Sequence, residues 1–558
     1  MKTFLFYFLI GAIALHSIQC AQPRPLTGGQ KDNQPPKVKK LSPANLSTNF
    51  SGNTIAMEFD EFVEIKSLNS ELVISPPLDY PVTYKIKGKR VFFEIKDTLT
   101  PNTTYNFNFG NAIVDLNEGN VLDSNLYVFS TGSYIDSGLV TGTVSDAFTQ
   151  EAMNGIKIVL YSAVNDSGLY KGSPRYVTQT DDKGNYQLRF LAKGDYNIYA
   201  LESPGENFKY VPQTHIGFHN ESIESEINPE VDMFLFKELD TLQFISKELS
   251  TDYFTFNIGF NNDLRKPRFK FIPSQKETDY YIEELKADSF KFWIPGDADI
   301  DSVTVLISDE TGYTDTVEVD VYSKEKYFKL LKKKKRSMPL LKIGLGSNAG
   351  VHHYFDTLQL TFSRPLVNWN IDSMKFVSGT DTIAMVDAFT KNLIKAELPD
   401  RKNGTSTQLR KILITHKWEP STEYAFIFDN GSFTDILNQS NDSTTLKFKT
   451  KNFEDYGSFR FTVKVDTYKG PLLLELLDTN GKKLRTYNIK SGDVIYHELA
   501  VPGTYKFRLI FDANDNKVWD TGNIEKGIQP EKIVNYKGTI DIRANWDMEE
   551  TWEVEFNP

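Results

Sequence analysis

Cysteine is almost absent from this sequence, because Cys20 is the only thiol among 558 residues. A disulfide framework needs pairs of cysteines, so a fold stabilised by disulfides is excluded. Beyond the first twenty residues no apolar run reaches the roughly eighteen residues that a membrane-spanning helix needs. The sequence also lacks an excess of basic residues, since its net charge is −11, and this argues against nucleic acid as a partner.

Catalytic motifs are lacking as well. The sequence contains no Gly-x-Ser-x-Gly elbow and no Gly-Lys-Ser/Thr phosphate loop. His215 and His219 lie in a strand-and-turn pattern without an adjacent glutamate base, so they do not form a zinc-protease motif. The neighbouring His352 and His353 would point to opposite faces of a strand. We therefore expect a protein that is not an enzyme.

The first twenty residues have the pattern of a secretory signal. An apolar run from Phe4 to Leu15 is too short to span a bilayer, and small or polar residues follow it. The end of this segment, Ser17-Ile-Gln-Cys20, resembles a relaxed bacterial lipobox, in which the chain is cut before a diacylated cysteine. The alternative is an ordinary signal with a cysteine near its end by chance. The resemblance implies a signal peptide at residues 1–19 and lipidation of Cys20.

Aromatic and β-branched residues dominate the rest of the chain. Its 40 Phe and 27 Tyr occur in short runs that alternate with Val, Ile and Thr and end at Gly, Pro, Asn or Asp. Thr54–Phe59, Val303–Ile307 and Tyr505–Ile510 are examples. Such runs are typical of half-buried strands joined by turns. The sequence therefore predicts an all-β fold of tandem β-sandwich domains in an elongated chain.

A tether and a first sandwich follow the cysteine. Residues 20–36 are rich in Pro, Gly and polar side chains, which predicts a flexible tether. Residues 37–133 contain Leu99-Thr-Pro-Asn-Thr-Thr-Tyr105, an Asp115-Leu-Asn-Glu-Gly-Asn120 loop and a closing Phe-Ser-Thr strand. These motifs resemble the SbsA-type bacterial Ig-like domain. The tyrosine is expected to lie in the core, with its hydroxyl on a backbone group.

The same motifs return in residues 340–451. Pro420 lies four residues before Tyr424, the spacing of the first copy, and Asp435 follows eleven residues later. The Gly-Asn turn is missing from this copy. A repeat with conserved spacing nevertheless predicts a second Ig-like domain.

Residues 138–237 carry different landmarks. Thr180-Asp-Asp-Lys-Gly-Asn-Tyr186 precedes Leu191-Ala-Lys-Gly-Asp-Tyr196. This pair of motifs resembles the carboxypeptidase regulatory-like domain, a non-catalytic sandwich of the transthyretin type. Gly184 is expected to take a positive φ in a hairpin turn, and the two tyrosines to share one core.

The third and last modules match no family by their motifs. Residues 238–336 are rich in strand patterns and end in the basic run Leu331-Lys-Lys-Lys-Lys-Arg336. We interpret this run as a solvated linker; the alternative is contact with anionic lipid or lipopolysaccharide phosphate. Residues 452–558 repeat the sandwich pattern of residues 138–237.

The last module contains an Asp/Asn-rich stretch, Asp512-Ala-Asn-Asp-Asn-Lys-Val-Trp-Asp520. Side-chain oxygens stand at relative positions 1, 3, 5 and 9 of this stretch, as in a calcium loop. They belong to Asp512, Asn514, Asn516 and Asp520. However, Lys517 occupies the position where such loops have glycine. The alternative is a turn without calcium that presents Trp519, a candidate for stacking on a ligand.

The order of these segments resembles a family of Bacteroidota Ig-like lipoproteins. The resemblance implies a lipid-anchored protein of the outer membrane and leaves open whether it faces the periplasm or the cell surface. We expect a scaffold or accessory subunit whose partners are outer-membrane β-barrels or other lipoproteins, in outer-membrane protein assembly or in a TonB-dependent transporter. The alternative function is a surface protein for glycan binding or adhesion. No cofactor other than calcium is expected.

Overall fold

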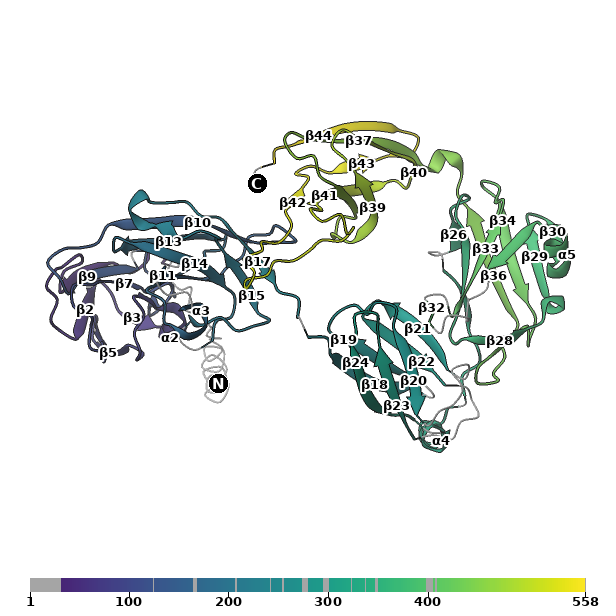
Figure 1. The fold of residues 1–558 in the computed structure, drawn as a ribbon, viewed down its shortest axis with the longest axis horizontal. Helices are drawn as coiled ribbons and strands as arrows, with labels where there is room; N and C mark the ends of the chain where they lie inside the picture. The colour runs from purple at the N-terminus through teal and green to yellow at the C-terminus, as the bar shows by residue number, and fades with distance from the viewer. Residues whose placement is uncertain are drawn as a thin grey trace, which may run out of the picture. The chain divides into compact units, whose positions relative to one another are not determined.

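The structure is a computed structural model, and it consists mainly of strands (Figure 1). It describes residues 32–123, 125–163, 168–205, 208–240, 242–252, 255–272, 280–294, 301–322, 324–336, 338–346, 350–397, 405–406 and 409–556. The chain divides into two compact units, Met1–Phe236 and Lys237–Pro558, and most contacts are made within one unit or the other. Five separate hydrophobic cores define five modules within these units. The prediction of an all-β fold is confirmed.

The first module (residues 38–130) is a sandwich around a core of phenylalanines. Its elements are β1 (Val38–Ser42), β2 (Thr54–Phe59), β3 (Val63–Ile65), α2 (Leu68–Glu71), β4 (Val73–Ser75), β5 (Thr83–Lys87), β6 (Arg90–Glu94), β7 (Thr104–Asn108), β8 (Ile113–Asp115) and β9 (Leu126–Ser130). The sheets have the orders β1-β2-β6-β5, β4-β7-β9 and β3-β8. Alternate residues of β2 (Ile55, Met57 and Phe59) point inward and are buried, as the period of two predicts.

The fourth module (residues 343–450) repeats this topology. Its elements are β25 (Ile343–Leu345), β26 (Val351–His352), β27 (Leu358–Phe362), β28 (Leu366–Trp369), η5 (Ile371–Ser373), β29 (Met374–Ser378), β30 (Asp381–Ala384), α5 (Met385–Thr390), β31 (Ile394–Glu397), β32 (Thr405–Ser406), β33 (Lys411–His416), β34 (Glu423–Phe428), β35 (Phe433–Asp435) and β36 (Thr444–Thr450). The orders β25-β27-β33-β31, β29-β34-β36 and β28-β35 correspond strand by strand to the first module, and β26 and β30 extend the second of these sheets.

An aspartate organises the same loop in both modules. The carboxylate of Asp115 accepts backbone N–H groups of four residues of its loop, at 2.6 to 3.1 Å. Burial alone would raise the pKa of Asp115, but these N–H groups outweigh it and lower the pKa to about 2. Asp435 accepts two loop N–H groups in the same way. The second loop is one residue shorter, and Asn438 takes the positive φ that Gly119 takes in the first.

The second module (residues 138–237) has another topology. Its elements are β10 (Gly138–Asp146), β11 (Lys157–Ser162), α3 (Gly168–Lys171), β12 (Tyr176–Gln179), β13 (Asn185–Leu191), β14 (Asp195–Leu201), β15 (His215–Phe218), β16 (Ile223–Glu224), η2 (Ser225–Ile227) and β17 (Met233–Lys237). The strand order is β12-β11-β14-β15-β17-β10-β13, with β16 on β14. Gly184 has φ +77°, and Tyr186 and Tyr196 belong to one core, as predicted.

The fifth module (residues 457–554) arranges its strands as the second does, except that its strands form two sheets and those of the second are joined through β15 and β17. Its elements are β37 (Gly457–Val465), β38 (Leu472–Leu477), β39 (Lys483–Ile489), β40 (Val494–Ala500), β41 (Gly503–Phe511), β42 (Ile533–Asn535), β43 (Ile540–Ile542) and β44 (Asp547–Val554). The orders β39-β38-β41-β42, with β43 on β41, and β40-β37-β44 match β12-β11-β14-β15, with β16 on β14, and β13-β10-β17. The pairings β10 with β17 and β37 with β44 are both parallel.

The third module (residues 245–333) ends in a helix where an irregular basic linker was expected. Its elements are β18 (Ile245–Asp252), β19 (Thr255–Phe260), β20 (Arg268–Ile272), β21 (Tyr281–Lys286), β22 (Ser289–Trp293), β23 (Ser302–Ser308), β24 (Thr314–Asp320) and α4 (Lys324–Lys333). Tyr327 and Leu331 lie four residues apart and therefore on one side of α4. Tyr327 packs against the core of the module and Leu331 is buried, which explains why this basic segment is helical.

Contacts between modules inside the second unit use buried polar groups. β21 of the third module pairs in parallel with β32 of the fourth. Beside this pair, Arg410 donates from Nε to both carboxylate oxygens of Glu283, at 3.0 and 2.9 Å, and the Trp293 indole donates to the same carboxylate at 3.1 Å.

Among the described helices, none has the length and apolar content required to cross a bilayer.

Candidate functional site in the fifth module

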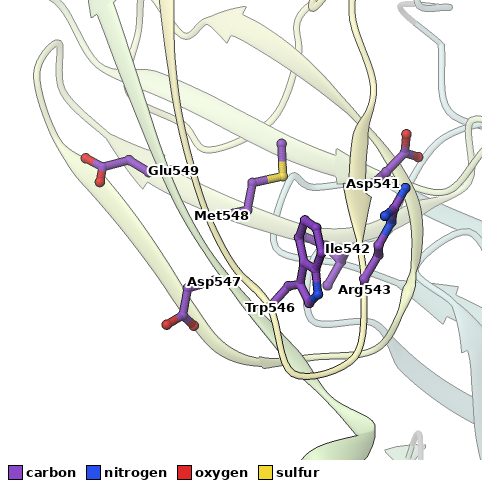
Figure 2. Close-up of a pocket in the computed structure, with 7 residues that line it drawn as sticks. All are labelled: Asp541, Ile542, Arg543, Trp546, Asp547, Met548 and Glu549. Carbon is purple, nitrogen blue, oxygen red and sulfur yellow. The ribbon is translucent and has the colours of Figure 1, made fainter.

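A pocket of about 370 Å³ lies between β43 and β44 of the fifth module (Figure 2). This volume is at the lower end of the range for small-ligand sites, about 300–1,000 Å³. Its lining residues are Asp541, Ile542, Arg543, Trp546, Asp547, Met548 and Glu549. Both strands lie at the edges of their sheets, since β43 pairs only with β41 and β44 only with β37 among the described strands. The pocket therefore opens where the two layers of the sandwich are not joined.

Trp546 is the most prominent side chain of this pocket. It is 61% exposed, and the Arg543 guanidinium lies 5.1 Å from the centre of its ring, within the range of a cation–π interaction. Figure 2 shows Trp546 and Met548 beside each other, with Arg543 and Asp541 on one side of them and the carboxylates of Asp547 and Glu549 on the other. An exposed indole thus lies in a pocket whose lining includes three carboxylates and one guanidinium.

The turn that carries Trp546 is held close to β37. The N–H of Ser458 donates to the carbonyl of Trp546 at 2.9 Å, and the Ser458 hydroxyl donates to the carboxylate of Asp547. A Cβ added to Gly457 would lie 2.4 Å from the carbonyl oxygen of Arg543. Glycine is therefore needed at position 457 for the close approach of β37 to this turn. Backbone contacts with β37 thus position the residue that carries the indole.

The side chains that line this pocket can recognise a ligand by stacking and by hydrogen bonds. Aromatic faces stack on apolar or cationic surfaces, and carboxylates and guanidinium groups exchange hydrogen bonds with hydroxyls. Three of the seven lining residues, Asp541, Asp547 and Glu549, carry carboxylates that can accept such hydrogen bonds. A ligand with one apolar face and several hydroxyl groups fits this set.

The predicted calcium residues are brought together in the loop between β41 and β42. Asp512 is fully buried and accepts the N–H groups of Asn516 and Lys517, each at 3.0 Å. The side-chain amides of Asn514 and Asn516 donate to one oxygen of Asp520, at 2.5 and 2.7 Å. The loop is therefore closed by its own hydrogen bonds, and calcium binding stays a prediction.

Trp519, the candidate for stacking on a ligand, does not lie on an exposed surface. Its side chain is half-buried, and its indole N–H donates to the carbonyl of Glu531 at 2.8 Å. The Glu531 carboxylate in turn accepts the N–H groups of Ala513 and Asp520. Burial raises the pKa of Glu531, although these hydrogen bonds act in the opposite direction. Trp519 thus serves to pack the Asp/Asn loop.

The histidines are dispersed. His215 contacts the Glu202 carboxylate at 2.7 Å, whereas His219 contacts the carbonyl of Glu221. His352 is buried, and the half-buried His353 lies 2.7 Å from the hydroxyl of Tyr456. Within the described residues, no three side chains of the His, Cys, Asp and Glu types are grouped as a metal site. Cys20, the predicted lipidation site, lies outside the described residues.

Sequence reasoning missed the pocket at Trp546. A usable signal was present, because a tryptophan that follows an Asn turn and precedes a strand of alternating acids is placed at a strand entry. The sequence does not show, however, that β43 and β44 leave the side of the sandwich open there.

Comparisons with known proteins agree with the topology. Residues 32–131 match the family described as bacterial Ig-like domain. No curated protein matches the sequence.

Several solved structures are similar at low identity. The major pilin subunit BcpA of Bacillus cereus is 12% identical, with 75% of this chain and 99% of that chain covered and a TM-score of 0.14. The TIE protein of Bacillus anthracis is 11% identical, with 95% and 75% covered and a TM-score of 0.14. Immunoglobulin domains 1–5 of Sidekick-1 are 9% identical, with 94% and 100% covered and a TM-score of 0.13. The strands of the structure and the family match of residues 32–131 show a tandem all-β chain with a bacterial Ig-like domain.

Proposed function

We propose that this protein is a non-catalytic lipoprotein of the outer membrane that acts as a scaffold or accessory subunit of an outer-membrane protein complex. Its anchor is the lipidated Cys20, followed by the tether of residues 20–36. The motif order that resembles Bacteroidota Ig-like lipoproteins supports the anchor and the location. We expect its partners in the complex for outer-membrane protein assembly or in a TonB-dependent transporter.

The observation that carries the proposal is the way in which the modules of the second unit are connected. The third and fourth modules share a strand pair and a carboxylate, Glu283, that is 4% exposed and bonded from both sides of the junction. A buried charge at a junction requires its partner on the neighbouring module. Polar groups therefore join these modules, together with the apolar cluster of Trp293, Leu409 and Ile436. Linked Ig-like modules present sheet edges and loops, which are common protein-binding surfaces.

A pull-down from detergent-solubilised outer membrane tests this proposal. The tagged protein is compared with Cys20→Ala, which lacks the acylated thiol but leaves every described residue unchanged. We expect β-barrel proteins or other lipoproteins at near-stoichiometric amounts with the wild type and a clear reduction with the variant. Recovery of the wild type without any partner would contradict a role as a subunit of an outer-membrane complex.

A surface glycan-binding or adhesion protein is the second candidate function, and the pocket at Trp546 is the observation that favours it. Stacking on an exposed indole contributes about 0.5–1.5 kcal/mol beyond area burial. Trp546→Ala in the full chain should therefore weaken binding on a glycan array about tenfold, whereas Tyr134→Ala, which removes another aromatic ring that is 58% exposed, should not. An array without any bound glycan would remove this candidate.

A further inference from the structure

Helix α4 and the three residues after it concentrate positive charge in an acidic protein. Residues 324–336 contain eight Lys or Arg and a single Glu, whereas the whole chain has a net charge of −11. Tyr327 packs against the core of the third module, and Leu331, four residues later, is buried. Five of the eight cations are therefore carried by an ordered helix with one fixed side, and this separates the segment from an ordinary solvated linker.

The outward side of this helix combines cations with an aromatic ring. Phe328 is 45% exposed, and Lys332 follows it by four residues on the same face. The last five cations, Lys332 to Arg336, are all exposed. In the described part of the chain, the salt bridges of α4 are Lys326 with Asp301 and Lys329 with Glu325, so none involves these five.

We propose that this basic patch, residues 324–336, docks on the phosphate headgroups of an anionic lipid membrane. Unneutralised cations next to an exposed aromatic side chain are typical of segments that lie in a membrane interface. The cations attract the phosphates, while the phenyl ring and the methylene stems of the lysines enter the boundary of the acyl chains. An acidic protein would satisfy the charges but would offer no acyl-chain boundary for the ring to enter. The inference is independent of Cys20 and of any protein partner.

Vesicle sedimentation tests the proposal with the chain from residue 21 onward, which includes every described residue and lacks the lipidated cysteine. The probes are vesicles of phosphatidylcholine alone and of phosphatidylcholine with 30% phosphatidylglycerol. We expect binding to the anionic vesicles only, and its loss in 0.5 M salt, because the Debye length then falls to a few ångströms. Each cation near an anionic surface contributes roughly a fivefold factor. Replacing Lys332 to Arg336 by Gln should therefore weaken binding at least about a hundredfold.

A matched control changes the same amount of charge elsewhere. Five exposed lysines of the fifth module are replaced by Gln, and this variant should bind as the wild type does. They are Lys464, Lys469, Lys482, Lys490 and Lys537. Phe328→Ser tests the ring separately and should reduce the binding that persists at intermediate salt.

Three results would overturn the proposal. They are absence of binding to anionic vesicles, equal losses in the two five-lysine variants, and retention on heparin without retention on vesicles. The last result would indicate a general polyanion surface or an acidic protein partner. Circular dichroism confirms that each variant keeps its strands. Because neither Cys20 nor a membrane complex enters this assay, its failure would leave the pull-down result unaffected.

Discussion

The N–H of Thr100 donates to the hydroxyl of Tyr105 at 2.9 Å, and this contact closes the entry to β7 of the first module. The hydroxyl of Thr131 donates to the carbonyl of the same Thr100 at 2.7 Å. In the fourth module, Glu419 makes the same two contacts with Tyr424 and Thr450, at 2.8 and 2.6 Å. The spaced Pro-to-Tyr repeat of the sequence therefore encodes one hydrogen-bonded corner that is built twice.

Tyr105→Phe should weaken this corner in the first module without changing its packing. The phenyl ring still fills the core, but the Thr100 N–H loses its acceptor, which costs about 1–2 kcal/mol. Hydrogen exchange of the peptide around Thr100 should accelerate, while the peptide around Tyr424 should be unaffected. Tyr134→Phe, at an exposed ring, is the control. Unchanged protection at Thr100 would show that the hydroxyl contributes nothing there.

Gly119 should tolerate asparagine but not valine. Its φ is +79°, and a Cβ there would meet only the Lys66 ammonium at 3.8 Å, so the backbone conformation is the constraint and space is not. Gly119→Val should destabilise the first module by about 1–2 kcal/mol. Gly119→Asn should cost less than half of this, because Asn438 takes the positive φ of the equivalent loop. Calorimetry of the two variants checks the difference, and equal losses would contradict it.

The sequence predicts the modules better than it predicts their contacts. Thr54–Phe59 was predicted as a strand, and β2 has the same bounds, because alternating burial is a local pattern. Gly184 and the two tyrosines of the second module were also predicted correctly, since turn chemistry is local. α4 was not predicted from the sequence, because its buried or half-buried residues, which include Tyr327 and Leu331, are few and lie among lysines. The helix depends on packing of Tyr327 against core residues that are far away in the sequence.

The candidate site could be predicted only in part for the same reason. The Asp/Asn loop is one continuous stretch of sequence, so its residues necessarily lie close together in the fold. The pocket at Trp546 depends on β43 and β44 lying at unpaired edges of two different sheets, which follows from pairing between distant strands. Trp519 and Trp546 both precede an aspartate in the sequence, yet one is half-buried and the other is exposed.

Glu283→Ala should loosen the junction between the third and fourth modules. The substitution leaves the Arg410 guanidinium and the Trp293 indole without their shared acceptor, at a cost of about 2–3 kcal/mol. Hydrogen exchange should rise in β32 and at Leu409. A double-mutant cycle with Arg410→Ala should give a coupling energy of about 1 kcal/mol or more. Glu310→Ala breaks the exposed pair with Lys266 and should change stability by less than about 0.5 kcal/mol.

Acidification should destabilise the fourth and fifth modules through three histidines. Burial lowers the pKa of His352, His353 and His497 from the ordinary value of 6.5. The unfolded chain therefore takes up protons at a higher pH than the folded chain, so stability is full above about pH 6.5 and falls as the pH decreases below it. His497→Gln should flatten the decrease in melting temperature between pH 7 and pH 5. His219→Gln, in the other unit, should leave it unchanged, and a steeper decrease in His497→Gln would contradict the assignment.

Calcium should stabilise the fifth module if the Asp/Asn loop binds it. Binding requires the Asn514 and Asn516 amides to turn their oxygens inward and release Asp520, which changes the surroundings of Trp519. We expect calcium, but not magnesium at equal concentration, to shift the tryptophan fluorescence, and a hundredfold excess over Kd to add about 2.7 kcal/mol to the free energy of unfolding. Asp520→Ala should abolish both effects. Asp478→Ala is the control, because Asp478 caps a turn of the same module by accepting the N–H groups of Asn480 and Lys482. An unchanged melting temperature and fluorescence at 10 mM calcium would leave the loop as a turn held by its own hydrogen bonds, with Asp512 as its buried centre.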